Sequence, residues 1–248
     1  MMSMNTNKVL FVLMFFAFAT VGFTASATMP TLDPQARQGR DTWGWWKRCG
    51  DKRNAILDQT NGWFDVVFVG DSITHFWENR GKMPYADIQK EFSVLNLGFA
   101  GDRTENVLWR FREAGHLKGY KAKLFMVMIG TNNFGGKAPC TPEQVAAGVG
   151  EIVAQIRAAH PESKVLLLPI FPEGRHPNPN GGRAKASRLI KELADGKEVL
   201  WLDFNDRFLT PEGELTKEVM SDLLHPTEKG YAIWRDAVLP VFRRVCGE

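Results

Sequence analysis

Five short apolar stretches constrain the fold of this 248-residue chain more than any other feature of its sequence. Each stretch is a continuous hydrophobic run rather than an alternation of polar and apolar residues. That pattern is typical of parallel strands that are covered on both faces. The stretches are DVVFVG (65–70), SVLNLG (93–98), KLFMVMIG (123–130), KVLLLPI (164–170) and EVLWLDF (198–204).

Helical patterns separate these stretches. TPEQVAAGVGEIVAQIRAAH (141–160) begins with Thr141 as a predicted N-cap, Pro142 at the first helical position and Gln144 completing a capping box. The last predicted helix starts at about Thr227 and contains Pro240, which we expect to kink it. The alternation predicts an α/β protein, a three-layer α/β/α sandwich around a five-stranded parallel sheet.

A Trp-rich segment, TWGWWKRCGDKRNAIL (42–57), precedes the first predicted strand. We interpret it as a helix whose Trp43 and Trp46 pack on the sheet, since a tryptophan cluster is more often a packing face than a sugar platform.

The N-terminus has the pattern of a secretory signal peptide. Lys8 precedes the apolar run VLFVLMFFAF (9–18), and Ala25-x-Ala27 follows as a cleavage site. The apolar run is too short to cross roughly 30 Å of hydrocarbon. The pattern therefore predicts cleavage after Ala27, a mature chain of residues 28–248 that forms one domain, and export to the periplasm or the extracellular medium without membrane attachment.

The charge of the chain argues against a nucleic-acid partner, and its three cysteines could be either paired or free. The formal net charge of +3 is too small to indicate a nucleic-acid partner. Cys49, Cys140 and Cys246 share no metal-ligand spacing, and the sequence has no dinucleotide-binding fingerprint. We expect no cofactor. Cys49 and Cys246 could form a disulfide in an oxidising compartment, and packed free thiols are the alternative. Nothing in the sequence predicts an oligomeric state.

Chemically suggestive groups follow the predicted strands. The motifs are GDS (70–72), GFAGDR (98–103), GTNN (130–133) and, after the fifth strand, SDLLHP (221–226). In a parallel sheet the carboxyl ends of the strands share one edge, which is where ligands bind. Together the four motifs supply the groups that acyl transfer through a serine requires.

Each group has a chemical role in such a reaction. Ser72 is the predicted nucleophile, His225 the base that takes its proton, and Asp222 the acid that fixes the imidazole tautomer. The backbone N–H groups of Ser72 and Gly101 and the side-chain amide of Asn132 are the predicted oxyanion donors. Taken alone, each motif has an ordinary alternative, such as an N-cap, an Asn-rich turn or a surface Asp–His pair.

The irregular segment FPEGRHPNPNGG (171–182) follows the fourth predicted strand, so we expect it to overhang the same edge. His176 lies in this segment and is a candidate for contact with the substrate. We interpret His116 and His160 as solvent-facing residues.

The motifs GDSI, GFAGD, GTNN and DLLHP resemble the four conserved blocks of the SGNH (GDSL-type) esterases and lipases. The stretches LNLGFAGDRTENVLWR and PEGRHPNP are similar to the platelet-activating-factor acetylhydrolase branch of that family and its bacterial relatives. The resemblance implies a flavodoxin-like sheet, a metal-free mechanism and a preference for short acyl groups, often acetyl. Either Gly98 or Gly101 could be the oxyanion glycine, and Gly101 matches those relatives better.

The substrate prediction joins this resemblance to the predicted export. Exported relatives often deacetylate carbohydrates, and Arg103, Glu173, Arg175 and Trp77 are polar and aromatic groups that suit a sugar. We therefore predict a secreted serine esterase that removes O-acetyl groups from a glycan or a small-molecule ester. The alternatives are a lysophospholipase or thioesterase for longer acyl chains and a non-catalytic glycan-binding module. GTNNFGGK is not a phosphate loop, because Lys137 stands one place too late.

Overall fold

The computed structural model describes residues 29–38, 42–136, 138–175 and 180–247. The predicted signal peptide and His176 lie outside these residues. The helices and strands along the chain are η1 (Pro30–Leu32), α1 (Thr42–Leu57), β1 (Trp63–Gly70), α2 (Ser72–His75), η2 (Phe76–Glu78), α3 (Lys82–Gln89), β2 (Val94–Gly98), α4 (Thr104–Arg112), β3 (Lys121–Met128), η3 (Thr131–Phe134), α5 (Pro142–Ala159), β4 (Lys164–Leu167), α6 (Asn180–Lys191), β5 (Val199–Trp201), η4 (Asn205–Phe208) and α7 (Glu228–Cys246).

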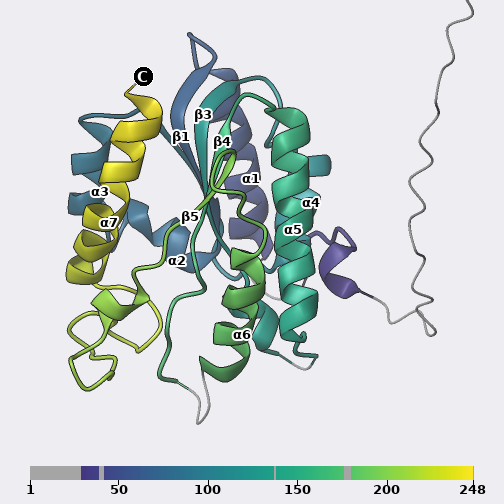
Figure 1. The fold of residues 1–248 in the computed structure, drawn as a ribbon. Coiled ribbons are helices and arrows are strands. Elements are labelled where there is room, and N and C mark those ends of the chain that lie inside the picture. The colour runs from purple at the N-terminus through teal and green to yellow at the C-terminus, as the bar shows by residue number, and fades with distance from the viewer. Residues whose placement is uncertain (1–28, 39–41, 137, 176–179, 248) are drawn as a thin grey trace, which may run out of the picture.

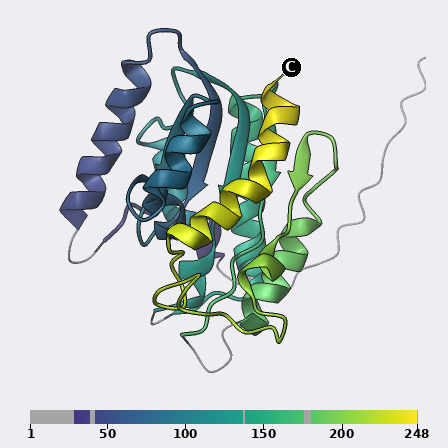
Figure 2. The ribbon, with the colours of Figure 1, turned by 90° about the vertical axis from the view of Figure 1, so that its left-hand side faces the viewer.

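The five strands form one parallel sheet in the order β2-β1-β3-β4-β5, with helices on both faces (Figures 1 and 2). The predicted three-layer α/β sandwich is therefore confirmed. Gly70 at the end of β1 pairs with Gly98 of β2 and with Met128 of β3. This register brings the segments that follow these three strands to the same edge.

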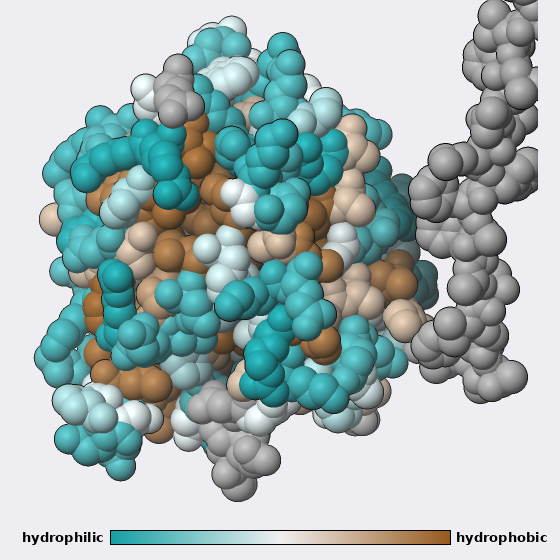
Figure 3. All heavy atoms as spheres, viewed as in Figure 1, coloured by the Kyte–Doolittle hydropathy of each residue, from teal (hydrophilic) through white to brown (hydrophobic). Residues whose placement is uncertain are grey.

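Alternate residues of each strand pack into two separate cores. Val66 and Phe68 of β1 contact the side chains of α3 and α7 on one face. Val67 and Val69 contact α4, α5 and the end of α1 on the other. Figure 3, drawn from the side of Figure 1, shows hydrophilic residues over most of that surface, with hydrophobic ones visible between α7 and α5.

The strands lie where the apolar stretches predict, but three of them end earlier. β3 stops at Met128, β4 at Leu167 and β5 at Trp201. A proline at position 169 has no N–H to donate to a neighbouring strand, which accounts for the end of β4. The predicted start of the 142–159 helix is confirmed, since Thr141 and Gln144 form the capping box.

The prediction for the Trp-rich helix was wrong in its detail. Trp43 is 74% exposed and Trp46 45% exposed, whereas Trp45 is buried. Three tryptophans within four residues cannot all lie on one face of a helix with 3.6 residues per turn. The residues that α1 buries are Trp45, Cys49 and Ile56.

The prediction for two histidines was also wrong. His116 and His160 are buried. The Nε2 atom of His116 lies within hydrogen-bond distance of the Cys49 carbonyl, and that of His160 within hydrogen-bond distance of the Leu117 carbonyl. Burial lowers the pKa of both rings, so they pack as neutral side chains.

The three cysteines are buried free thiols. Burial raises the pKa of Cys49 and of Cys246 to about 12, which disfavours the reactive thiolate. Of the two alternatives, the structure thus shows packed thiols. No helix in the described part of the chain is long and apolar enough to cross a membrane.

Candidate active site

The tight end of β1 places Ser72 at the carboxyl edge of the sheet. A side chain at Gly70 would collide with Thr74 and with the Met128 carbonyl, so only glycine allows α2 to begin directly after the strand. Asp71 is the buried N-cap of α2 and accepts a hydrogen bond from the Ile73 N–H. The N-cap interpretation of this motif is therefore correct, and it is compatible with a functional role for the next residue.

Ser72, His225 and Asp222 form a continuous hydrogen-bonded chain, although Ser72 and His225 are 153 positions apart in the sequence. Ser72 Oγ lies 2.9 Å from His225 Nε2, and His225 Nδ1 lies 2.8 Å from Asp222 Oδ2. If the carboxylate accepts the Nδ1 proton, Nε2 is left as an acceptor for the serine proton. The arrangement can therefore activate the hydroxyl for nucleophilic attack.

The ionisation of these groups suits that role. Burial would raise the pKa of Asp222, but the hydrogen bonds from His225 and the positive charge of Arg175 outweigh it and hold that pKa well below its usual range. Burial lowers the pKa of His225, with Arg80 and Arg175 adding to the effect against the opposing pull of Asp222. The imidazole is therefore neutral, and competent as a base, near neutral pH.

The turn that carries Asp222 and His225 is strained and braced. Leu223 has φ of 58°, a left-handed conformation that is unfavourable for a branched side chain. Asp222 Oδ1 accepts hydrogen bonds from the N–H groups of Leu224 and His225, and Gly174 donates to the Leu223 carbonyl. Such strain persists only where surrounding contacts enforce it.

Arg175 contacts this turn directly. Its Nε donates to the Asp222 carbonyl at 2.8 Å, its Nη2 donates to Asp222 Oδ2, and the same nitrogen lies 3.5 Å from His225 Nδ1. The sequence marked Arg175 only as a group that suits a sugar. In the structure it is a partner of the acid–base pair.

The segment after β2 supports Gly101 rather than Gly98 as the oxyanion glycine. The Gly98 N–H donates to Asn96 Oδ1 at 2.8 Å, so it is already used. Gly101 has φ of +80°, and its N–H has no hydrogen-bond partner within the described residues. Asn132 Nδ2 donates to the carbonyl of Asp102, the residue after Gly101, which places the two predicted donors side by side.

A buried ion pair anchors that segment. Asp102 and Arg110 are both 0% exposed, and Arg110 Nε lies 2.9 Å from Asp102 Oδ2. Trp45 Nε1 donates to the other carboxylate oxygen at 2.6 Å. Arg110 also lies 3.9 Å above the centre of the Phe99 ring. Helices α1 and α4 therefore fix the position of the loop that carries Gly101.

The predicted substrate-contact residues have different surroundings. Arg103 is part-buried, pairs with Glu105 at 2.6 Å, and lines a cavity of about 340 Å³ together with Gly101. Glu173 is buried and its Oε1 lies 2.8 Å from Arg183 Nη1, and Trp77 is completely buried in the core. Glu173 and Trp77 therefore do not offer the exposed surface that contact with a sugar requires.

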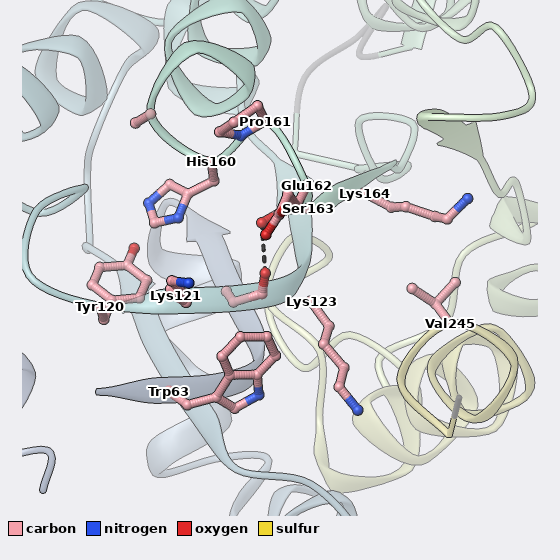
Figure 4. Close-up of a pocket in the computed structure, with 12 residues that line it drawn as sticks. Trp63, Tyr120, Lys121, Lys123, His160, Pro161, Glu162, Ser163, Lys164 and Val245 are labelled. Carbon is pink, nitrogen blue, oxygen red and sulfur yellow. Dashed lines mark hydrogen bonds between the residues drawn. The ribbon is translucent and has the colours of Figure 1, made fainter. Parts of the chain in front are cut away.

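A separate cavity of about 460 Å³ lies at the other end of the sheet (Figure 4). Trp63, Lys121 and Lys164 line it at the amino ends of β1, β3 and β4, and Val245 borders it from α7. Because the strands are parallel, this cavity is remote from the edge that holds Ser72. Among the described residues, no group of three or more His, Cys, Asp or Glu side chains is arranged to hold a metal ion.

Comparison with known proteins agrees with this arrangement. The model of the GDSL-like Lipase/Acylhydrolase family matches residues 68–233, which include Ser72, Gly101, Asn132 and His225. Among solved structures, a GDSL-like lipase from Bacteroides thetaiotaomicron is similar at 18% identity with a TM-score of 0.64, covering 80% of this chain and 97% of that chain. An acetyl xylan esterase is similar at 18% identity with a TM-score of 0.59, covering 71% and 98%.

Two relatives show higher identity. The platelet-activating factor acetylhydrolase IB subunit alpha2 of Rattus norvegicus is 34% identical over 197 residues, covering 79% of this chain and 81% of its own. The alpha1 subunit of Pongo abelii is 35% identical over 174 residues, covering 68% and 71%. The chain therefore belongs to the GDSL-like lipase/acylhydrolase family and is a carboxylic ester hydrolase of the SGNH type.

Proposed function

We propose that this protein is an exported serine esterase that removes short acyl groups, above all O-acetyl groups, from a carbohydrate through an acyl-enzyme. The observation that carries the catalytic part of the proposal is the chain of contacts from Ser72 Oγ through His225 to Asp222, at 2.9 and 2.8 Å. It is the geometry that a serine nucleophile with its own base requires.

The proposed reaction has two halves. Ser72 Oγ attacks the ester carbonyl carbon while its proton passes to His225 Nε2. The resulting oxyanion accepts hydrogen bonds from the N–H groups of Ser72 and Gly101 and from Asn132, and each such donor lowers the barrier by about 3 to 4 kcal/mol. The carbon–oxygen bond to the alcohol then breaks, and the alcohol leaves with the proton held by His225.

In the second half, water gives a proton to His225 and its oxygen attacks the acyl-enzyme. The second tetrahedral intermediate collapses, acetate leaves, and the proton returns from His225 to Ser72 Oγ. Asp222 keeps its charge throughout and stabilises the imidazolium in each half, as its low pKa allows.

Three considerations support a short acyl group and a carbohydrate as the alcohol. The cavity of about 340 Å³ beside Gly101 is lined largely by charged and polar residues, including Arg37, Arg103 and Glu105, which are poor surroundings for a fatty acyl chain. Several relatives are named as acetylhydrolases, and one structural neighbour as an acetyl xylan esterase. The signal-peptide pattern supports a carbohydrate outside the cytoplasm as the substrate.

The test measures hydrolysis of 4-nitrophenyl acetate and octanoate, followed by mass spectrometry for acetate released from acetylated xylan fragments, sialic acids and related sugars. We expect acetate turnover, poor octanoate turnover and release from at least one glycan. Faster octanoate than acetate hydrolysis would instead support the long-chain alternative. Fractionation of the producing cell tests export separately.

Replacing the nucleophile tests the catalytic half of the proposal. Ser72→Ala and His225→Ala should each remove most turnover, and the double variant should lose little more, because the two groups act as a unit. Full acetate turnover by Ser72→Ala would contradict the mechanism and favour the non-catalytic binding module. Thermal unfolding of each variant separates loss of activity from loss of folding.

A further inference from the structure

A cavity of about 240 Å³ lies between the first turns of α1 and the loop that carries Gly101. Trp45 and Phe99 give it aromatic walls, and Arg37, Arg48 and His75 give it polar ones. The family model begins only at residue 68, so Arg37, Trp45 and Arg48 are features of this chain that the family match does not cover.

Arg37 joins this cavity to the predicted oxyanion donor. The Arg37 guanidinium occupies the space that a Cβ on Gly101 would fill, so it lies directly against that glycine. It also donates to the Ala100 carbonyl. Arg37 lines the neighbouring cavity of about 340 Å³ as well, together with Gly101 and Arg103. A group bound at Arg37 would therefore lie beside the reacting ester.

The cavity has an excess of positive charge. Arg48 and Lys52 share a single carboxylate, that of Glu78, at 2.7 and 2.6 Å. No carboxylate lines the cavity itself among the described residues. Burial lowers the pKa of His75 to about 4, with the charges of Arg48 and Lys52 adding to the effect against Glu78. Asp102, the buried acid that Trp45 contacts, is already paired with Arg110.

Arg37 still has donors to offer. Within the described residues it forms no ion pair, and its hydrogen bond goes to an uncharged carbonyl. A guanidinium has five N–H donors in a fork that matches a carboxylate or phosphate. Arg48, in contrast, is largely committed to Glu78 and to the carbonyls of Asn96 and Gly98.

We propose that this cavity binds an anionic group, a carboxylate or phosphate, on the alcohol part of the ester, with Arg37 as its main partner. The inference rests on the proposed function and narrows its substrate to acidic esters. Trp45 and Phe99 would pack against the apolar face of the ring or chain that bears the charge.

The experiment compares esters that differ by one charge. The first pair is an acetylated methyl glucuronoside and its uncharged methyl ester, and a third substrate, acetylated glycerol 3-phosphate, tests phosphate as the source. We expect kcat/KM for the glucuronoside to exceed that of its methyl ester by about tenfold or more at low salt, since charge-assisted hydrogen bonds are the stronger ones. A larger preference for the phosphate ester would identify phosphate as the source.

Variants assign the preference to a residue. Arg37→Gln should reduce the charged-to-neutral ratio of kcat/KM to near one, and Arg37→Lys should keep part of it as a point charge. The matched control is Arg112→Gln, an exposed arginine of α4 that pairs with Glu151, for which the ratio should match the wild type.

The outcomes separate the two proposals. Turnover of neutral acetyl esters without a preference for either anion would refute the anion site and leave the esterase proposal intact. A preference that survives Arg37→Gln in a folded protein would also refute the assignment. Absence of any acetyl-ester turnover would count against the esterase proposal itself.

Discussion

Two aspartate–arginine pairs flank Ser72, and they differ in their contact with water. Asp102 and Arg110, behind the oxyanion loop, are both 0% exposed. The side chains of Asp222 and Arg175, beside the predicted base, are 34% and 38% exposed. The Asp222–Arg175 pair is therefore in contact with water, whereas the Asp102–Arg110 pair is not.

This difference implies different tasks. A buried pair must satisfy its charges inside the protein, and Asp102 does so with Arg110 and the Trp45 indole, which fixes the loop in one position. An exposed pair is screened by solvent, so it contributes little stability. Arg175 instead acts on the ionisation of its neighbours. The first pair should control folding and geometry, and the second should control pH dependence.

Removing Arg110 should have the largest effect on stability. Arg110→Met leaves Asp102 buried without its cation, and breaking a buried pair in this way typically costs about 3 to 5 kcal/mol. Denaturant unfolding measures the loss. The control is Arg112→Met on the same helix, whose exposed pair with Glu151 should change the free energy of unfolding by less than about 0.5 kcal/mol.

The pH dependence of that loss sharpens the comparison. Burial already raises the pKa of Asp102 against the pull of Arg110, and removing the cation must raise it further. The folded variant then binds a proton that the unfolded chain does not, so its stability rises as pH falls towards the unfolded carboxyl pKa near 4. A loss in Arg110→Met that stays the same from pH 8 to pH 5 would contradict an uncompensated Asp102.

Replacing Asp222 should affect catalysis more than stability. In Asp222→Asn the amide no longer stabilises the imidazolium and can hold the ring in the wrong tautomer, so kcat should fall roughly 10²- to 10³-fold. The loss should remain smaller than that of Ser72→Ala or His225→Ala. Steady-state hydrolysis of 4-nitrophenyl acetate measures it, and an unfolding midpoint near that of the wild type shows that the fold is retained.

The sequence predicted those parts of the site that adjoin the strands. Ser72, Gly101 and Asn132 each follow a strand closely, so the strand pattern alone brought them to one edge of the sheet. His225 and Asp222 were found through their spacing within one motif, and the structure joins them to Ser72. The catalytic roles of these residues stay predictions that the variants test.

The sequence did not predict the residues that support the site from a distance. Arg110 stands between Trp109 and Phe111 in a helix, and only the structure shows that its guanidinium points inward, to Asp102 and to the Leu97 carbonyl of β2. Arg37 lies in a segment without helical or strand periodicity. His116 and His160 were predicted wrongly because a histidine can be buried when a backbone carbonyl lies within hydrogen-bond distance of its ring. The carbonyls come from residues distant in the sequence or from the surrounding fold, so no local pattern predicts them.

Removing Arg175 should have the smallest effect and should mainly shift the pH profile of activity. The positive charge of Arg175 helps to lower the pKa of His225, which must be neutral to act as a base. In Arg175→Ala that pKa rises, so the acid limb of the kcat/KM profile moves to higher pH, while activity above the limb changes by no more than about fivefold, as for an exposed pair. High salt should move the wild-type limb towards that of the variant, because screening weakens the same charge.

The control is Arg243→Ala on α7, whose exposed pair with Glu91 is remote from the imidazole and should leave the profile unchanged. A limb that moves to lower pH in Arg175→Ala would show that Arg175 acts mainly by holding Asp222 against His225, and the exposed pair would then share the positioning task of the buried one.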